Sequence, residues 1–337
     1  MRAVADTAPL HPARRLRLLP WAPLLTLAMM LGPVAAGLVG TLAPALGYMP
    51  ALGGHGLGLA AFDALFAWPG LPRAVMLSLG VGFTATAISL AIVVLICAGW
   101  AGTRTFGLIE RLLSPLLSVP HAAAAFGLAF LIAPSGWIAR ALSPMLTGWQ
   151  SPPDLLILQD PAGLSLIFGL VTKEVPFLLL MTLAALTQAR PGQSLRLAQA
   201  LGYARVTGWL KVIFPLVYRQ IRLPVYAVLA FSMSVVDVAI ILGPNTPPTL
   251  AVQVVRWMSD PDLAMRFQAA AGAVLQLGLV LFGLGLWRGM EMAVARCARA
   301  WIARGGRGRR GGEQALRGGA LLLGGLAAGA VIAGLGG

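Results

Sequence analysis

The most constraining feature of this sequence is a series of seven long apolar blocks separated by polar segments. Each block reaches about the 20 residues that an α-helix needs to cross the hydrocarbon core of a bilayer. Only 11% of the residues are charged, whereas soluble domains carry roughly 25%. The sequence therefore predicts an all-α polytopic membrane protein, with blocks at 18–41, 74–98, 112–134, 163–187, 223–243, 268–287 and 318–336.

The basic residues alternate between the segments that separate the blocks. Four Lys or Arg precede the first block, and two, six and eight follow blocks two, four and six, whereas the alternate loops hold four in all. Because cytoplasmic loops carry the excess of Lys and Arg, we expect a cytoplasmic tail at 1–17 and outer loops at 42–73, 135–162 and 244–267. This distribution also accounts for the net charge of +14 without a nucleic-acid partner, since such binders gather their basic residues on one face.

The segments next to the blocks carry three further expectations. The first block is longer than the apolar region of a signal peptide, so we expect a retained span. The stretch 57–68 is too short to span and contains Asp63, which indicates a short helix at the outer interface. Residues 299–317 read as a basic, Gly-rich cytoplasmic linker, and 318–337 as a seventh span or the start of a second, truncated copy of the unit.

The Cys and His residues predict no metal site. Cys97 and Cys297 lie far apart in the sequence, at the predicted cytoplasmic ends of two apolar blocks, and the three histidines are also far apart. None of these residues has the close spacing of metal ligands. We interpret the cysteines as reduced thiols.

The cytoplasmic loop at 190–222 is predicted to fold as a small helix–turn–helix. Ser194 is suited to cap a helix that begins at Leu195, and Gly202 is suited to end it. A second helix would run to about Ile213 and end before Pro215. The first helix would present an apolar face made of Leu195, Ala198 and Leu201. This face could be a handle for another protein or could rest on lipid headgroups.

The spacing in this loop resembles that of the permeases of ATP-binding-cassette (ABC) importers. Those permeases carry Glu-Ala-Ala, three residues, Gly, nine residues and Ile-x-Leu-Pro. The matching positions here are 196–198, Gly202 and 212–215. The spacing from Gly202 to Pro215 fits, Ala198 keeps one Ala, and Arg196 stands where the family has Glu.

The resemblance extends over roughly 70–290. Ser114-Pro115 through Pro120, followed by 127–129, is similar to the Pro-rich entry to a core span of these permeases, and 231–243 with its Pro/Thr loop is similar to their fifth core span and outer gate. The likeness is strongest to the sulfate/molybdate/thiamine/iron type, including the YnjC-like branch, which is often double-length.

The resemblance implies the transmembrane helical bundle of a type I ABC importer over 18–298, in a bacterial inner membrane. It implies a transport subunit, not an enzyme, that forms the path for a small solute. The implied partners are a cytoplasmic ABC ATPase dimer, an external substrate-binding protein and a second permease unit. No cofactor is expected in this chain, because neither lysine has the Gly-Lys-Ser/Thr context of a P-loop, so ATP would bind to the partner. The implied docking loop comprises Leu195, Arg196, Ala198, Leu201, Gly202 and Pro215.

Three charged residues fall inside predicted spans: Lys173, Glu174 and Asp237. Charges at the bilayer centre cost about 2.5–3.5 kcal/mol each on insertion scales, so they should face the interior or a water-filled path. Three interpretations stay open: a buried ion pair, with Asp237 as a partner for Lys173, a lining of the solute path, or a proton relay. Pro176 would free a backbone carbonyl and suit a moving gate.

The outer loop at 243–249 contains three prolines and is expected to be stiff. We interpret Gly243, Pro244, Asn245 and Pro247 as an outer gate or as a docking surface for an external protein. The same sequence is equally compatible with an ordinary turn that has no such function.

Two other function classes compete with the permease. An ion-coupled secondary transporter would use Lys173, Glu174 and Asp237 for coupling, but its inverted repeats require corresponding broken helices, and the sequence suggests one. A membrane enzyme would need paired carboxylates, a His cluster or a nucleophile motif, and the sequence offers none of these.

Overall fold

Six long apolar helices form the body of the chain. The computed structural model describes residues 21–189 and 191–308 and the single positions 314, 318, 319, 322 and 325. In this part of the chain, six helical segments are long and apolar enough to cross a membrane, which confirms the predicted six-span helical bundle. The expected tail at 1–17 and most of the block at 318–337 lie outside the described residues.

Four of these spans are single helices: α1 (Ala22–Ala45), α3 (Leu71–Trp100), α7 (Leu164–Ala189) and α13 (Met265–Ala303). The other two run over His121–Leu142 and Arg205–Ser234 and consist of shorter helices. The remaining helices are α2 (Ala60–Ala67), α4 (Arg104–Ser118), α5 (His121–Ile132), α6 (Trp137–Leu142), α8 (Pro191–Ala200), α9 (Arg205–Gly208), α10 (Phe214–Ser234), α11 (Asp237–Leu242) and α12 (Leu250–Met258).

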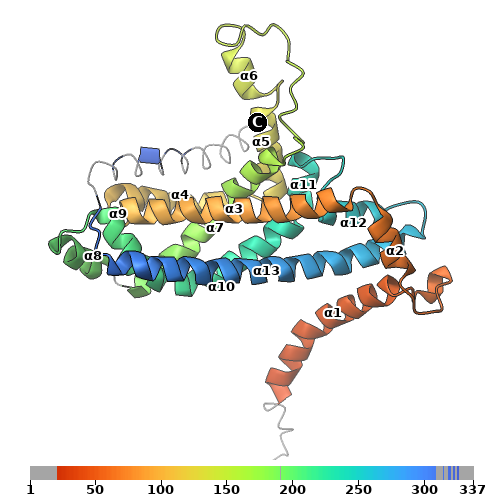
Figure 1. Cartoon of the computed structure of the whole chain (residues 1–337). Coiled ribbons are helices and arrows are strands. Elements are labelled where there is room, and N and C mark those ends of the chain that lie inside the picture. The colour runs from red at the N-terminus through yellow and green to blue at the C-terminus, as the bar shows by residue number, and fades with distance from the viewer. Residues whose placement is uncertain are drawn as a thin grey trace, which may run out of the picture.

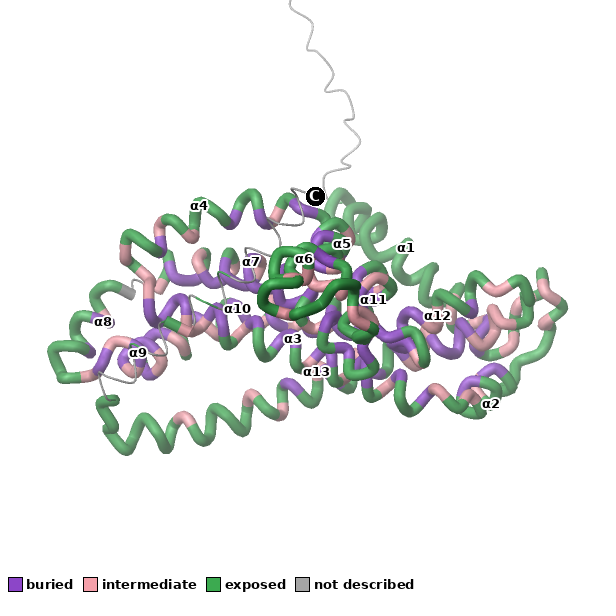
Figure 2. The backbone as a smooth tube through the Cα atoms, turned by 90° about the horizontal axis from the view of Figure 1, so that it is seen from above, coloured by how far each residue is buried: buried purple, intermediate pink, exposed green. Residues whose placement is uncertain are grey.

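The core lies where α3, α7 and α10 pack against one another, and their facing residues are buried (Figure 2). In a membrane, small residues let helices approach closely. Gly82 of α3 and Gly283 of α13 both lie against the side chain of Met233, and a Cβ at either glycine would overlap it. The two glycines therefore set how closely α3 and α13 approach α10.

The predicted span at 112–134 is two helices instead of one. The amphipathic helix α4 ends at Ser118, and α5 begins at His121. Pro120 disfavours helical geometry at the residue before it, and Val119 is extended, with ψ at 127°. The prediction of one continuous helix was wrong because it gave apolar length more weight than this proline.

The predicted span at 223–243 is also divided. α10 starts earlier, at Phe214, and ends at Ser234, while α11 starts at Asp237. The break leaves the carbonyl of Met233 without a helical donor, and the Gln276 side chain of α13 donates to it at 3.0 Å. A polar side chain on a neighbouring helix thus satisfies the broken backbone, as a low-dielectric environment requires.

The bundle is elongated, with different short helices at its two ends (Figure 1). α8 and α9 lie at the end that the charge count assigns to the cytoplasm, and α2 and α12 lie at the other. α1 contacts α13 but extends away from the bundle, and its large apolar side chains are exposed. Such a helix needs lipid or another protein around it.

Candidate functional site

The cytoplasmic loop begins with α8, which starts at Pro191 and not at Leu195 as predicted from Ser194. Proline is well suited to the first helical position, where its missing N–H is not needed. α8 ends at Ala200, and the chain turns at Gly202, the predicted helix stop, which has φ of +85°. The amides of Gly202 and Tyr203 bond to the carbonyls of Gln199 and Ala198, at 2.9 and 3.1 Å, the pattern of a helix closed by a left-handed glycine.

The predicted apolar face of α8 is divided between the interior and the solvent. Leu195 and Ala198 are buried, and both lie against Gly208, where a Cβ would come within 3.2 Å of the Ala198 Cβ. Leu201 is 60% exposed, and Leu197, which the prediction omitted, is 66% exposed. Leu195 and Ala198 therefore hold the loop together, and the apolar surface open to a partner is made of Leu197 and Leu201, with Arg196 exposed beside them.

The second helix of the loop does not end before Pro215. It passes from α9 through a π-helical turn at Trp209–Ile213 directly into α10. Within this turn the amide of Phe214 bonds to the carbonyl of Trp209, five residues back. Pro215 lies in the first turn of α10, where a missing N–H is tolerated. The loop is thus continuous with a membrane-spanning helix.

Arg205 connects this loop to the end of α3. Its Nε donates to the carbonyl of Gly99 at 3.0 Å, and its Nη2 donates to that of Ala101 at 2.5 Å. Carbonyls at a helix C-terminus lack intrahelical partners and carry partial negative charge, so a guanidinium is well placed there. A displacement of the loop would therefore be transmitted to α3 as well as to α10.

Lys173 in α7 does not pair with Asp237. Its ammonium donates to the carbonyls of Leu116 and Val119, at 2.9 and 2.6 Å. These carbonyls are available because α4 ends there. In the described part of the chain, no ion pair joins Lys173 to Asp237. Backbone carbonyls thus replace the expected carboxylate.

Glu174 lies between three helices of the core. Its side chain is buried and accepts hydrogen bonds from the hydroxyls of Ser89 in α3, at 3.0 Å, and Ser232 in α10. Two hydroxyl donors on a buried carboxylate reduce the cost of removing it from water. The sequence did not reveal these serines, because a serine inside a span can equally bond to its own helix backbone.

Asp237 lies at the start of α11, beside the break after α10, and is exposed. It was predicted in the middle of a continuous span. Lys173 and Glu174 are therefore held by different groups, and within the described residues no hydrogen bond or ion pair joins either of them to Asp237. α7 continues as a helix through Pro176.

A second buried carboxylate, missed in the sequence, joins α10 to α13. Glu291 accepts hydrogen bonds from the hydroxyls of Tyr218 and Tyr226, at 2.6 and 3.0 Å. Arg288 donates to it at 2.8 Å, and Arg222 lies 3.5 Å away. The spacing of Tyr218, Arg222 and Tyr226 by fours, which places them on one face of α10, was the available signal.

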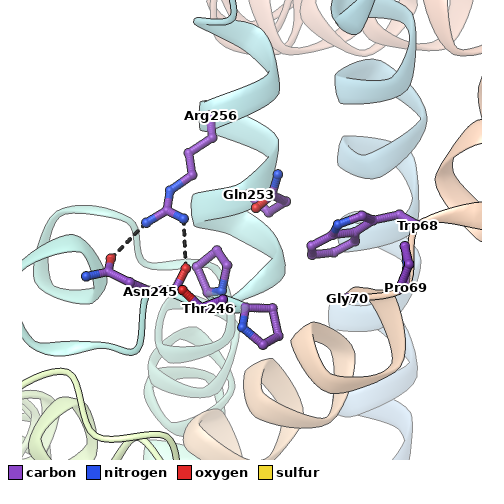
Figure 3. A pocket seen from close by; sticks show the side chains of 9 residues that line it. Trp68, Pro69, Gly70, Asn245, Thr246, Gln253 and Arg256 are labelled. Atoms are coloured by element: carbon purple, nitrogen blue, oxygen red, sulfur yellow. Dashed lines mark hydrogen bonds between the residues drawn. The ribbon is translucent and has the colours of Figure 1, made fainter. Parts of the chain in front are cut away.

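The predicted outer loop forms one wall of a surface pocket of about 540 Å³. Arg256 of α12 donates to the backbone oxygen of Asn245 at 2.9 Å and to its Oδ1 at 2.8 Å (Figure 3). The Asn245 amide in turn donates to Gln159 at 2.5 Å. Of the predicted loop residues, Gly243 and Pro244 are buried, Asn245 is exposed and Pro247 is half-buried. The opposite wall is formed by Trp68, Pro69 and Gly70.

Asp160 lies in the outer segment before α7 and caps that helix. Its carboxylate accepts from the amides of Leu164 and Ser165, at 2.8 and 2.9 Å, and from the Ser165 hydroxyl at 2.9 Å. Burial alone would raise the pKa of Asp160, but these hydrogen bonds outweigh burial and hold the pKa below its usual value.

Comparison with known proteins identifies the family. No protein-family model matches the sequence. The inner membrane ABC transporter permease protein YnjC of Escherichia coli (strain K12) is 34% identical over 248 residues, which is 71% of this chain and 46% of YnjC. The chain thus spans about half the length of this relative.

A solved structure shares the fold. A bacterial ABC transporter involved in the import of the acidic polysaccharide alginate matches with a TM-score of 0.61 and 19% identity, over 80% of this chain and 95% of that chain. The six spans and the inner-membrane relative agree with the predicted location. The chain belongs to the permease family of ABC transporters and has the transmembrane fold of an importer permease.

Proposed function

We propose that this chain is the membrane subunit of an ABC importer and forms part of the path for a solute. A separate ATPase docks on the loop around Gly202, binds ATP and carries out its hydrolysis. One observation carries the proposal. The loop lies at one end of the bundle, is continuous with α10 and is bonded to α3 by Arg205. Such a loop can convey a rigid-body push to two spans at once.

The exposed part of this loop is small and suited to a groove. Leu197 and Leu201 are its exposed apolar residues, and Gly202 allows close approach at the turn. Amphipathic helices commonly bind partners by laying such residues into a groove. Leu195 and Ala198 lie behind this surface and fix its shape through their packing against Gly208.

The external binding protein would engage the opposite end. The pocket between Trp68 and the loop at 244–248 is open and framed by stiff prolines. Arg256 fixes Asn245 at two atoms, so the wall is preorganised, which lowers the entropic cost of binding. Solute release into the bundle would begin there.

A second permease unit completes the proposed transporter. It would be another copy of the chain or a second unit in the same polypeptide. The support is the exposed apolar surface of α1, which only lipid or protein can cover, and the greater length of YnjC.

The test is recovery of the complex from native membranes. We expect a P-loop ATPase to copurify with the tagged chain and to hydrolyse ATP. Leu201→Arg should abolish copurification, because a charge would enter an apolar groove. Met145→Arg is the matched control, since Met145 is 94% exposed in the segment predicted to be outside. Normal ATPase recovery with Leu201→Arg would refute the docking assignment.

A further inference from the structure

A short segment after α13 lies across the cytoplasmic loop. We name this segment, residues 304–308, the strap. The amide of Ala204 donates to the carbonyl of Arg307 at 2.9 Å. A Cβ at Gly202 would lie 3.5 Å from the Arg307 Cδ, and a Cβ at Gly308 would overlap Thr207. The strap therefore passes directly beside the Gly202 turn.

Lys211 holds the strap in this position. It is 7% exposed, and its ammonium donates to the carbonyls of Trp301, at 3.2 Å, and Gly306, at 2.8 Å. The same ammonium lies over the rings of Trp301 and Tyr203, 4.6 and 5.3 Å from their centroids. Cation–π contacts of this kind stabilise a desolvated cation. A buried lysine that bonds the end of α13 to the loop is a built contact and indicates a fixed arrangement.

The charged residues of the loop and the strap are all basic. Arg196 of the loop and Arg304 and Arg307 of the strap are all exposed. Neither 191–222 nor 299–308 contains an Asp or Glu. A partner groove with an acidic rim would complement this surface, and such complementarity raises association rates and affinity.

We propose that the strap is part of the docking surface, so that the ATPase binds the loop and the strap together in an acidic-rimmed groove. Lys211 is the positioning residue that holds the strap there. The inference rests on the proposed function for the nature of the partner. It adds α13 to the spans that the ATPase moves, because the strap continues that helix.

The first test reverses the charge of the strap in the full chain. We expect Arg304→Glu with Arg307→Glu to weaken binding of the purified ATPase by about tenfold or more, as loss of complementary charge predicts. The matched control is Arg296→Glu, compared with Arg304→Glu and Arg307→Glu as single variants. Arg296 is exposed on α13 and lies about 12 Å along the helix from Arg304. An equal effect of the control and of the single strap variants would overturn the proposal, because only net charge or lipid contact would then matter.

The same measurement separates this proposal from the proposed function. If Leu201→Arg abolishes binding but the strap reversal changes it by less than about twofold, the strap proposal is wrong and the docking loop stands. If Leu201→Arg also leaves binding intact, the docking function itself is wrong.

The second test follows amide hydrogen exchange over 300–308, with and without the ATPase. We expect exchange in the strap to slow about tenfold or more in the complex, since a docked segment opens less often. Lys211→Met should speed strap exchange in the free chain and weaken ATPase binding, and Lys211→Arg should restore part of both. Faster or unchanged strap exchange in the complex would show that the ATPase displaces or ignores the strap, and would overturn the proposal.

Discussion

Individual polar residues inside the bundle act as connections between helices. Glu174 bonds to Ser89 and Ser232, and thereby joins α3, α7 and α10 at one point. Asp160, outside the core, accepts hydrogen bonds from the first amides of α7. Because both carboxylates have their own partners, we expect both to contribute to stability.

Replacement of Glu174 tests this expectation. Glu174→Ala should lower the free energy of unfolding in detergent by about 2–4 kcal/mol, because it leaves a cavity and removes the acceptor of the Ser89 hydroxyl. The Ser232 hydroxyl can still bond to the carbonyl of Val228. Glu174→Gln should cost less, since the amide oxygen can still accept one bond. Thermal unfolding of both variants checks the order. A Glu174→Gln protein of normal stability with failed ATP-driven uptake would instead place Glu174 in the solute path.

Asp160 predicts a pH dependence. Its folded pKa lies below the unfolded value of about 3.9, so its contribution is present above that value and is lost as pH falls through the folded pKa. Asp160→Asn should lower the free energy of unfolding at pH 7 by about 0.3–1 kcal/mol, the typical contribution of a negative charge at a helix N-terminus, and should therefore lower the Tm. Below pH 4 the difference should become progressively smaller. Tm measurements from pH 7 to pH 3 check this; a difference that grows on acidification would contradict it.

At the scale of helices, the ends of α4 and α10 inside the bundle expose backbone carbonyls, and polar side chains from other helices bond to them. The carbonyls freed at the end of α4 hold Lys173, and the carbonyl freed at the end of α10 holds Gln276. Each break is thus joined to another helix by a side chain. Helix ends inside a membrane need such partners, because lipid offers none.

Lys173 should therefore be independent of Asp237. Lys173→Met should destabilise the protein by about 1.5–3 kcal/mol, because two carbonyls lose a charged donor. Combining it with Asp237→Asn should give the sum of the two single effects within about 0.5 kcal/mol. Denaturation of the four proteins in this cycle gives the coupling energy. A coupling above about 1 kcal/mol would revive the ion pair.

The sequence predicted which segments are apolar and which are basic, and these gave the six spans and the all-helical fold. It did not predict the break after α10, because the Val235-Val236 pair is locally compatible with an apolar span. Pro120 did signal the break before α5, but the apolar length of the block was given more weight. The sequence also could not predict the partners of Lys173 and Glu174. These partners lie more than 50 residues away in the sequence, and nothing in the local pattern marks a carbonyl as free or a serine as a donor.

The cytoplasmic loop shows the same division. The Gly202 turn was predictable, because helices often end in a residue with a left-handed conformation and glycine adopts that conformation most easily. The inward orientation of Leu195 and Ala198 was not, because it depends on Gly208 and the following helix. The position of Lys211 was not predictable either, because its partner, the carbonyl of Trp301 at the end of α13, lies 90 residues away in the sequence.

At the scale of the whole molecule, the two ends of the bundle have different structures. One end carries the pocket fixed by Arg256, and the other carries the loop that Arg205 and Lys211 bond to α3 and α13. A push on the loop would move α10 directly, and α3 and α13 through these bonds. This arrangement suits a subunit that converts a movement at one end into opening at the other.

The most direct test of the central claim is site-specific crosslinking from Leu201 in native membranes. Leu201→Cys in a Cys297→Ser background leaves one exposed thiol among the described residues, since Cys97 is buried. A photoactivatable maleimide at this thiol should give an adduct that mass spectrometry identifies as a P-loop ATPase, whereas the same probe at Asn245→Cys, on the outer loop, should not. Absence of the ATPase from the Leu201 adduct, or an equal ATPase adduct from Asn245, would contradict the account.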